Sequence, residues 1–459
     1  MKKIFILFSA LLFTATMMAS CESPVPPEPE PQPQDSIPAE LQALKQSVVV
    51  TDNWVFDSKP SITIRIENPN VVSVDAAIKV SITTDQRRAA ATIEKTVSVA
   101  ANSSEDVVVT TDEVLAPGFY KANCFVNQRI ARSFYFGINP TAIVSEPDKQ
   151  PDFDAYWDAA KEQLDSIDMN AQLTELEKKS TDKRKIYLVE LQSVPDSPDG
   201  DPVIVRGYYA EPQDGQKHPV IMHFYGYDSQ NATSWPPCPG GNDSEYAEFF
   251  FSIRGQMLNN RGATHRYPDG KEEDFVNIYG DWFAYNFGVK DGYYYRGAFM
   301  DCVQAVRFMA TRESSDMTQL FAEGSSQGGA LSYAVAALSD YPFTAIAPCV
   351  AFLGDFPDYF NIVSWPAETA KANKGDMTDE EMYAFLSYFD TKNLATRISA
   401  AVIACSGLQD GTCPPHTNLA PFNNLLTEDK VIYYYPEMGH EIPSDWNKKI
   451  MTFFKARMK

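Results

Sequence analysis

One segment near the middle of the chain restricts its fold more than any other, because a strand-like run, a glycine-rich turn and a helix-forming run follow one another directly. The run Gln319-Leu-Phe-Ala-Glu323 has strand character, and the four alanines between residues 330 and 337 favour a helix. Between these runs, Ser326 has Gly324 two residues before it and Gly328 two residues after it. Glycines at these positions let strand and helix approach closely around a strained serine. The pattern predicts a nucleophile elbow, in which Ser326 projects at the N-terminus of a helix.

Strand-like and helix-like runs alternate on both sides of this elbow, from about Asp152 to the end of the chain. The run 400–405 is apolar almost throughout, as a strand buried on both faces should be. This order predicts an α/β fold over 150–459, of the α/β-hydrolase type, with a mostly parallel sheet flanked by helices. The expected strands are 186–191, 203–210, 220–224, 319–323, 346–352, 400–406 and 431–435.

The segment 46–140 has a different pattern, because apolar and polar residues alternate there in short runs. Examples are Ile62-Thr-Ile-Arg-Ile66 and Phe134-Tyr-Phe-Gly-Ile138, and turns such as Asn68-Pro-Asn70 separate the runs. This pattern predicts a small all-β, Ig-like sandwich domain. The segment offers no nucleophile, base or metal cluster, so a spacer or docking module is a better interpretation than specific glycan binding.

The first 45 residues carry signals for export. Two lysines precede an apolar run from Ile4 to Phe13 that is too short to cross a bilayer, which predicts a signal peptide over 1–20. Cys21 resembles the lipid-modified cysteine of a bacterial lipobox, and a cysteine there by chance is the alternative. Residues 21–45 are rich in proline and acid, as in an extended tether. We expect a protein anchored by a lipid on Cys21 to the bacterial outer membrane, at its periplasmic face or on the cell surface.

Composition excludes some classes of partner. The chain has 61 Asp and Glu against 39 Lys and Arg, a formal net charge of −22, so its surface would repel nucleic acid. The cysteines after Cys21 show no C-x-x-C or metal-ligand spacing, and we expect no metal and no cofactor. Cys405 and Cys413 are the only pair close in sequence, and buried free thiols are a better interpretation than a disulfide in a domain of this size.

A serine at neutral pH needs a base, and the order of the chain limits the choice. In this fold the nucleophile, the acid and the histidine follow in that order, so only His416 and His440 qualify. His440 follows a strand and a glycine, whereas His416 falls in the first turn of a helix after two prolines and is assigned a structural role. Asp410 follows the strand 400–406, about thirty residues before His440, and is the expected acid. A turn aspartate before Gly411 is the alternative.

An oxyanion hole needs two backbone N–H groups, one from the residue after the nucleophile and one from the loop after an early strand. Gln327 is expected to supply the first. Gly226 allows a tight bend after the strand 220–224, so Tyr227 is the expected second donor.

Five blocks of sequence resemble the acetyl xylan esterase and cephalosporin C deacetylase family. The resemblance covers the C-terminal two-thirds of the chain, and two of the blocks, Arg-Gly-Gln and Tyr-Tyr-Arg-Gly, are not general features of hydrolases. It implies a serine esterase with a small acyl pocket that removes O-acetyl groups from xylan-type oligosaccharides or other acetylated sugars. The implied triad is Ser326, Asp410 and His440, and the implied oxyanion donors are the amides of Tyr227 and Gln327. The blocks are Gly324-Ser-Ser-Gln-Gly-Gly329, Arg254-Gly-Gln256, Tyr293-Tyr-Tyr-Arg-Gly297, Asp410-Gly-Thr-Cys-Pro-Pro415 and Gly439-His-Glu441.

The chain departs from the family pattern in ways that leave substrate choice and the family's hexameric assembly open. Tyr225 stands where the family usually has His, Met257-Leu-Asn-Asn260 replaces the usual continuation of Arg-Gly-Gln, and the sandwich is an addition. The segment 354–393 carries aromatic residues and is expected to pack over the mouth of the site, where an amphipathic lid is a better interpretation than a sugar platform. Tyr225 and Trp365 are the candidate substrate contacts.

Two alternative functions are less well supported. A serine peptidase of the prolyl-oligopeptidase kind would share the elbow and the triad order, but it usually carries a β-propeller, and no repeat of blade length is present. A glycan-binding lipoprotein on an inactive hydrolase scaffold conflicts with the presence of a serine, an acid and a histidine in the expected order.

Overall fold

The computed structural model describes residues 38–197, 199–227, 245–259, 264–266, 272–274 and 279–459. The expected signal peptide, Cys21 and the tether up to residue 37 lie outside the described residues. No helix in these described ranges is long and apolar enough to cross a membrane.

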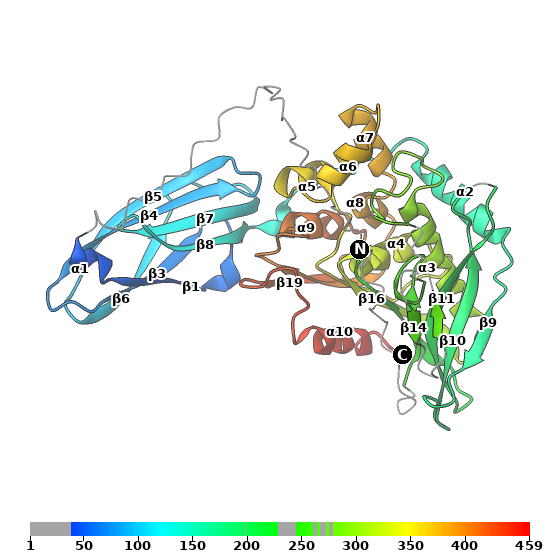
Figure 1. Cartoon of the computed structure of the whole chain (residues 1–459). Helices are drawn as coiled ribbons and strands as arrows, with labels where there is room; N and C mark the ends of the chain where they lie inside the picture. The colour runs from blue at the N-terminus through cyan, green and yellow to red at the C-terminus, as the bar shows by residue number, and fades with distance from the viewer. Residues whose placement is uncertain (1–37, 198, 228–244, 260–263, 267–271, 275–278) are drawn as a thin grey trace, which may run out of the picture.

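The first described part of the chain forms two β-sheets packed face to face (Figure 1). One sheet has three strands in the order β1-β3-β6, and the other has five in the order β2-β8-β7-β4-β5. Alternation sets the core, since Ile62, Ile64 and Ile66 are buried while Arg65 and Glu67 between and after them are exposed. Except for β2 and β8, neighbouring strands are antiparallel. The strands are β1 (Lys45–Val49), β2 (Val55–Phe56), β3 (Ser61–Asn68), β4 (Val74–Thr84), β5 (Ala89–Val99), β6 (Ser103–Thr110), β7 (Gly118–Val126) and β8 (Arg129–Ile138).

The rest of the chain is built on one nine-stranded sheet in the order β19-β18-β17-β16-β12-β13-β11-β10-β9. The strands from β19 to β13 run parallel, and β11, β10 and β9 extend the sheet in antiparallel fashion. The predicted α/β-hydrolase fold is confirmed. The strands are β9 (Gln172–Glu175), β10 (Arg184–Ser193), β11 (Val203–Pro212), β12 (His218–Phe224), β13 (Ala247–Ser252), β16 (Ser315–Ser325), β17 (Ala345–Cys349), β18 (Ala401–Gly407) and β19 (Lys430–Tyr435); β14 (Thr264–Arg266) and β15 (Glu272–Asp274) form a separate pair.

Two strand expectations need correction. The strand expected over 346–352 ends at Cys349, because Val350 has a φ of 41° and turns the chain out of the sheet. The sequence-based prediction also omitted β9, β13 and the short pair β14 and β15, although the apolar run Phe249-Phe-Phe251 within β13 is typical of a buried strand.

Helices cover both faces of the large sheet (Figure 1). Leu320 and Ala322 of β16 face α3 (Tyr294–Ala310) and α4 (Gln327–Leu338) on one side, with α2 (Phe153–Asp165) packed outside α3. Phe321 faces α10 (Trp446–Lys455) on the other side, where it packs on Phe454. The remaining α-helices are α1 (Ala39–Gln42), α5 (Phe356–Ile362), α6 (Ala367–Asn373), α7 (Asp379–Leu386), α8 (Thr391–Ala395) and α9 (Pro415–Asn423).

Candidate active site

Ser326 lies at the turn between β16 and α4, in a backbone conformation that few residues adopt. Its φ is 56° and its ψ is −120°. The flanking glycines are needed for close backbone approach: a Cβ on Gly324 would lie 2.5 Å from the Gly328 carbonyl, and one on Gly328 would lie 2.4 Å from the Phe224 oxygen. The Ser326 N–H donates to the Cys349 carbonyl at 2.9 Å, which ties the turn to β17. The predicted elbow geometry is therefore present.

The structure brings Ser326, His440 and Asp410 together in one chain of hydrogen bonds, although they come from three separate loops. His440 Nε2 lies 2.9 Å from Ser326 Oγ, and His440 Nδ1 lies 2.8 Å from Asp410 Oδ2. Asp410 has a fully buried side chain, whereas that of His440 is 26% exposed. A hydroxyl, an imidazole and a carboxylate in this order can carry a proton away from the serine.

Backbone amides fix the carboxylate of Asp410. Its Oδ1 accepts from the N–H groups of Thr412 and Cys413, both at 2.8 Å, which leaves Oδ2 to face the imidazole. A carboxylate can only accept at Nδ1, so it holds the proton there and leaves Nε2 as the acceptor for the serine hydroxyl.

The loop after β12 passes beside the nucleophile. A Cβ on Gly226 would lie 3.8 Å from the Ser326 Cβ. Gln256 Nε2 donates to the carbonyls of Tyr225 and Gly226, at 3.2 and 2.6 Å. Because C=O and N–H point in opposite directions across a trans peptide, this contact turns the Tyr227 N–H away from Gln256. Gln327 is the first residue of α4, where backbone N–H groups have no acceptor within the helix.

Sequence reasoning missed the roles of the Arg-Gly-Gln and Tyr-Tyr-Arg-Gly blocks in supporting this loop. Arg254 is buried and binds both carboxylate oxygens of Asp301, at 2.9 and 2.7 Å, as well as Asp196 at 2.7 Å. A Cβ on Gly297 would lie only 2.1 Å from the Arg254 guanidinium. The two blocks therefore fit each other, and together they position Gln256.

Comparisons with known proteins decide the family. The acetyl xylan esterase (AXE1) family model matches residues 143–458. The chain belongs to the acetyl xylan esterase family. It is accordingly a carbohydrate esterase, a carboxylic ester hydrolase, and the resemblance stated from the sequence blocks is confirmed.

Individual relatives agree with this assignment. The chain is 24% identical over 367 residues to acetyl esterase Axe7A of Xylanibacter ruminicola, covering 77% of each chain. Acetyl xylan esterase 1 of Thermoanaerobacterium sp. superposes with a TM-score of 0.57 at 25% identity, covering 70% of this chain and 98% of that one. An acetyl xylan esterase of Paenibacillus sp. R4 gives 0.57 at 26% identity, covering 69% and 98%. The sandwich strands precede the part of the chain that the family model matches, and they form two packed sheets instead of propeller blades.

Aromatic side chains of this esterase cluster around the elbow. Phe352, whose N–H donates to the Ser326 carbonyl at 3.0 Å, stacks on Trp365 with ring centroids 5.3 Å apart. Tyr227 packs on both Trp365 and Trp282, with centroids 5.4 and 5.0 Å away. Trp365 comes from the segment 354–393 that was expected to cover the site, and its side chain is half-buried.

Tyr225, the other candidate substrate contact, has a buried hydroxyl that finds no hydrogen-bond partner among the residues that the structure describes. Burial, together with the nearby carboxylates of Glu323 and Glu248, raises the pKa of this phenol well above its usual value. Both carboxylates bind His223, at 2.7 and 3.0 Å. Among the described residues no hydrogen bond joins the Tyr225 side chain to the triad, so its role in binding stays a prediction.

His416 lies in a separate cluster of charges. Its Nε2 is 3.2 Å from both Asp355 and Asp358, and its Nδ1 is 3.8 Å from Asp85 of the sandwich. Burial lowers the pKa of His416, but hydrogen bonds to Asp355 and Asp358 and the charge of Asp85 outweigh it and raise the pKa to about 10. His416 is therefore a fixed cation at neutral pH. Within the described ranges, Asp355, Asp358 and His416 also form the group whose spacing could hold a metal ion.

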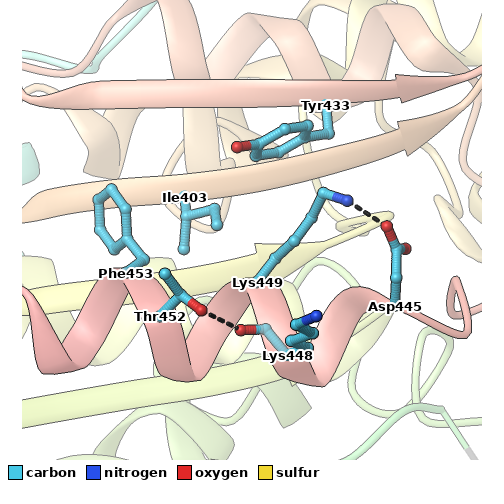
Figure 2. Close-up of a pocket in the computed structure, with 7 residues that line it drawn as sticks. All are labelled: Ile403, Tyr433, Asp445, Lys448, Lys449, Thr452 and Phe453. Carbon is cyan, nitrogen blue, oxygen red and sulfur yellow. Dashed lines mark hydrogen bonds and ion pairs between the residues drawn. The ribbon is translucent and has the colours of Figure 1, made fainter.

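The described cysteines are free thiols, and none of them is a member of the triad. Cys405 contacts Cys349 on the neighbouring strand, with 2.7 Å between the sulfurs, and not Cys413, its neighbour in sequence. Cys238 lies outside the described residues. A hollow of about 330 Å³ between α10 and the edge of the sheet includes none of the triad residues (Figure 2). It is lined by Ile403, Tyr433, Asp445, Lys448, Lys449, Thr452 and Phe453.

Proposed function

We propose that this esterase removes O-acetyl groups from xylan-type oligosaccharides or other acetylated sugars, with Ser326 as nucleophile, His440 as base and Asp410 as orienting acid. The observation that carries the proposal is the continuous hydrogen-bonded chain from the strained elbow serine through His440 to a carboxylate fixed by two amides. The amides of Tyr227 and Gln327 serve as the oxyanion hole.

The geometry suits a two-step acyl transfer. As Ser326 Oγ attacks the acetyl carbonyl carbon, its proton passes to His440 Nε2, and the new negative charge forms on the carbonyl oxygen beside the two amides. The sugar hydroxyl then leaves with the proton from His440, and an acetyl group remains on Ser326. Water, deprotonated by His440, attacks this acetyl ester, and acetate is released as His440 returns the proton to the leaving Ser326 Oγ. Asp410 accepts the hydrogen bond from Nδ1 and stabilises the imidazolium.

The aromatic walls favour a small acyl group and a sugar as the alcohol. The rings of Phe352, Trp365 and Tyr227 are packed on one another beside the elbow, and longer acyl chains would clash with them. An indole face such as that of Trp365 can also stack on a sugar ring. Acetyl esters should therefore be hydrolysed faster than butyryl or longer esters.

An acetate-release screen tests the proposal. Acetylated xylo-oligosaccharides, acetylated monosaccharides and cephalosporin C would be compared, each with the wild type, Ser326→Ala and Ser325→Ala. Ser325 is the matched control, because it is the adjacent serine of the same turn. We expect only Ser326→Ala to abolish acetate release from every substrate; turnover by folded Ser326→Ala, or a preference for octanoyl over acetyl esters, would contradict the assignment.

We further propose that the protein is exported and anchored to the outer membrane through a lipid on Cys21, as the lipobox-like sequence suggests. A proline-rich tether of this length spans roughly 3 Å per residue and would hold the enzyme some tens of ångströms from the bilayer. Both the wild type and Cys21→Ala would be produced in the same bacterial host and supplied with labelled palmitate. We expect the wild type to incorporate the label and Cys21→Ala not to. Equal label in both, or none in either, would contradict it.

A further inference from the structure

The sandwich domain contacts the two loops that carry the proposed acid and base. Figure 1 shows strand β19 and helix α9 at the junction with the sandwich. The loop after β18 carries Asp410, and the loop after β19 carries His440. The residue before Asp410 is Gln409, and its side chain reaches β8 of the sandwich.

The carboxamide of Gln409 pairs with both backbone groups of one strand residue. Its Oε1 accepts from the Tyr135 N–H at 2.8 Å, and its Nε2 donates to the Tyr135 carbonyl at 3.0 Å. A neighbouring strand would bind the edge of a sheet in the same way. Strand β2 leaves Tyr135 uncovered, because it pairs with β8 only at Gly137 and Ile138. Only a group with a donor and an acceptor side by side can make this pair.

The same carboxamide also reaches the loop of the base. Gln409 Nε2 donates to the Pro436 carbonyl at 2.7 Å, four residues before His440. The backbones of the two loops are joined as well, because the N–H of Leu408 donates to Tyr435 at 3.0 Å and that of Gln409 donates to Met438 at 2.9 Å. A shift of Gln409 would therefore move Asp410 and His440 relative to Ser326, which is anchored elsewhere, on β16 and β17.

We propose that the sandwich domain is a working part of the active site, and that Gln409 is a positioning residue which locks the Asp410 and His440 loops onto strand β8. This inference rests on the proposed function, since it assumes that these loops carry the acid and the base. It assigns a catalytic purpose to a domain that lies outside the residues matched by the family model.

Other contacts across the junction provide a control. Gln86 of the sandwich donates to Asp358 of α5 at 2.8 Å, and neither residue lies in the two catalytic loops. Loss of this bond weakens docking of the domains without releasing Asp410 or His440. If the sandwich acts only as a spacer, substitutions at Gln86 and Gln409 should have equal effects.

The experiment compares full-length Gln409→Met, Gln409→Glu and Gln86→Met with the wild type and Ser326→Ala, on p-nitrophenyl acetate and on an acetylated xylo-oligosaccharide. We expect Gln409→Met to lower kcat about tenfold or more with KM within twofold, because misaligned groups retard proton transfer while the acyl pocket is intact. Gln86→Met should keep kcat within twofold. Thermal unfolding of each variant identifies any that is not folded, and kcat is then taken at a temperature where all are folded.

The pH profile separates positioning from general weakening. An ionised carboxylate in Gln409→Glu has no donor for the Tyr135 and Pro436 carbonyls, whereas a protonated carboxyl regains one donor next to one acceptor. The kcat of Gln409→Glu relative to wild type should therefore increase as pH falls from 7.5 to 5, while the same ratio for Gln409→Met stays flat.

The outcomes distinguish this inference from the proposed function. Wild-type kcat in Gln409→Met, an equal loss in Gln86→Met, an effect on KM alone, or parallel pH ratios for the two Gln409 variants would each overturn the positioning role. Activity in folded Ser326→Ala would instead overturn the proposed function itself.

Discussion

Two regions of this esterase each place a histidine against aspartates, yet the two imidazoles are held in different ways. At the elbow, His440 faces one carboxylate and one hydroxyl, and the second oxygen of Asp410 is occupied by two backbone amides. At the domain junction, His416 faces three carboxylates, and no hydroxyl is among its described partners. The first arrangement has an acceptor nitrogen directed at a reacting group, whereas the second has charges on every side.

The difference shows that the number and placement of carboxylates determine what an imidazole can do. Three nearby carboxylates hold the pKa of His416 at about 10, so it stays charged and cannot accept a proton at neutral pH. In return, hydrogen bonds from His416 and the charge of Lys392 keep the pKa of buried Asp355 at about 2. That cluster joins the sandwich to the segment 354–393, and its ion pairs stabilise the fold. The elbow is built for proton transfer.

Replacing each histidine with alanine should give the largest difference in kcat between the two regions. His440→Ala removes the base, and we expect kcat on p-nitrophenyl acetate to fall at least 10⁴-fold, because members of a triad act as a unit. His416→Ala should leave the kcat of the folded enzyme within about tenfold, since in the structure it contacts neither Ser326 nor Asp410. A larger loss of kcat in folded His416→Ala than in His440→Ala would reverse the assignment.

Substitutions of the aspartates that contact the two histidines should differ in kcat in the same way. In Asp410→Asn the amide can offer N–H to Nδ1, which favours the imidazole tautomer whose Nε2 carries hydrogen and cannot accept the serine proton. We expect kcat to fall about 10⁴-fold with little change in the unfolding midpoint. Asp358→Asn is the control at the other histidine, and its kcat should change less than threefold. Near-normal kcat in Asp410→Asn would mean that Asp410 is only a turn residue.

Local sequence patterns predicted the elbow region well. The glycines around Ser326, the chain order of nucleophile, acid and histidine, and the apolar run of β18 are each readable within a few residues. The strand before a loop dictates where the loop lies in a parallel sheet, so Asp410 and His440 could be expected near the same edge. Ser326, Asp410 and His440 do lie together.

The junction could not be predicted from such patterns, because its contacts join residues far apart in the chain. Gln409 and Tyr135 are separated by 274 positions, and nothing local marks either as a partner of the other. The three carboxylates around His416 likewise come from two domains. Cys405 shows the same limitation, since strand order places it against Cys349 and not against the nearby Cys413.

Loss of the charge at His416 should reduce stability in a pH-dependent manner. His416 has its pKa raised from 6.5 to about 10 on folding, so its contribution is fully present below pH 6.5 and is lost as pH rises through 10. His416→Gln leaves the carboxylates unpaired and should cost roughly 3 kcal/mol of unfolding free energy at pH 6.5. The deficit relative to wild type should shrink by pH 9.5, because there the wild type has lost most of this contribution too.

Urea unfolding at pH 6.5 and 9.5 measures this effect, with His218→Gln as the control. His218 pairs with Asp214, whose side chain is 49% exposed, so its loss should cost less than about 1 kcal/mol at either pH. A deficit in His416→Gln that is equal at both pH values would show that His416 contributes by packing and not by charge.

The smallest effect is expected at the exposed ion pair of the same junction. Arg132 of β8 binds Glu437 at 2.8 Å, one residue beyond Pro436, but the two side chains are 32% and 58% exposed. Water and salt screen such a pair, so Glu437→Gln should change the unfolding free energy by less than about 0.5 kcal/mol and kcat by less than twofold. Urea unfolding in low salt and in 0.5 M NaCl measures the change in unfolding free energy. The difference between Glu437→Gln and the wild type should vanish in the higher salt. A kcat loss in Glu437→Gln as large as that expected for Gln409→Met would mean that charge, and not the neutral amide pair with Tyr135, couples the sandwich to the base.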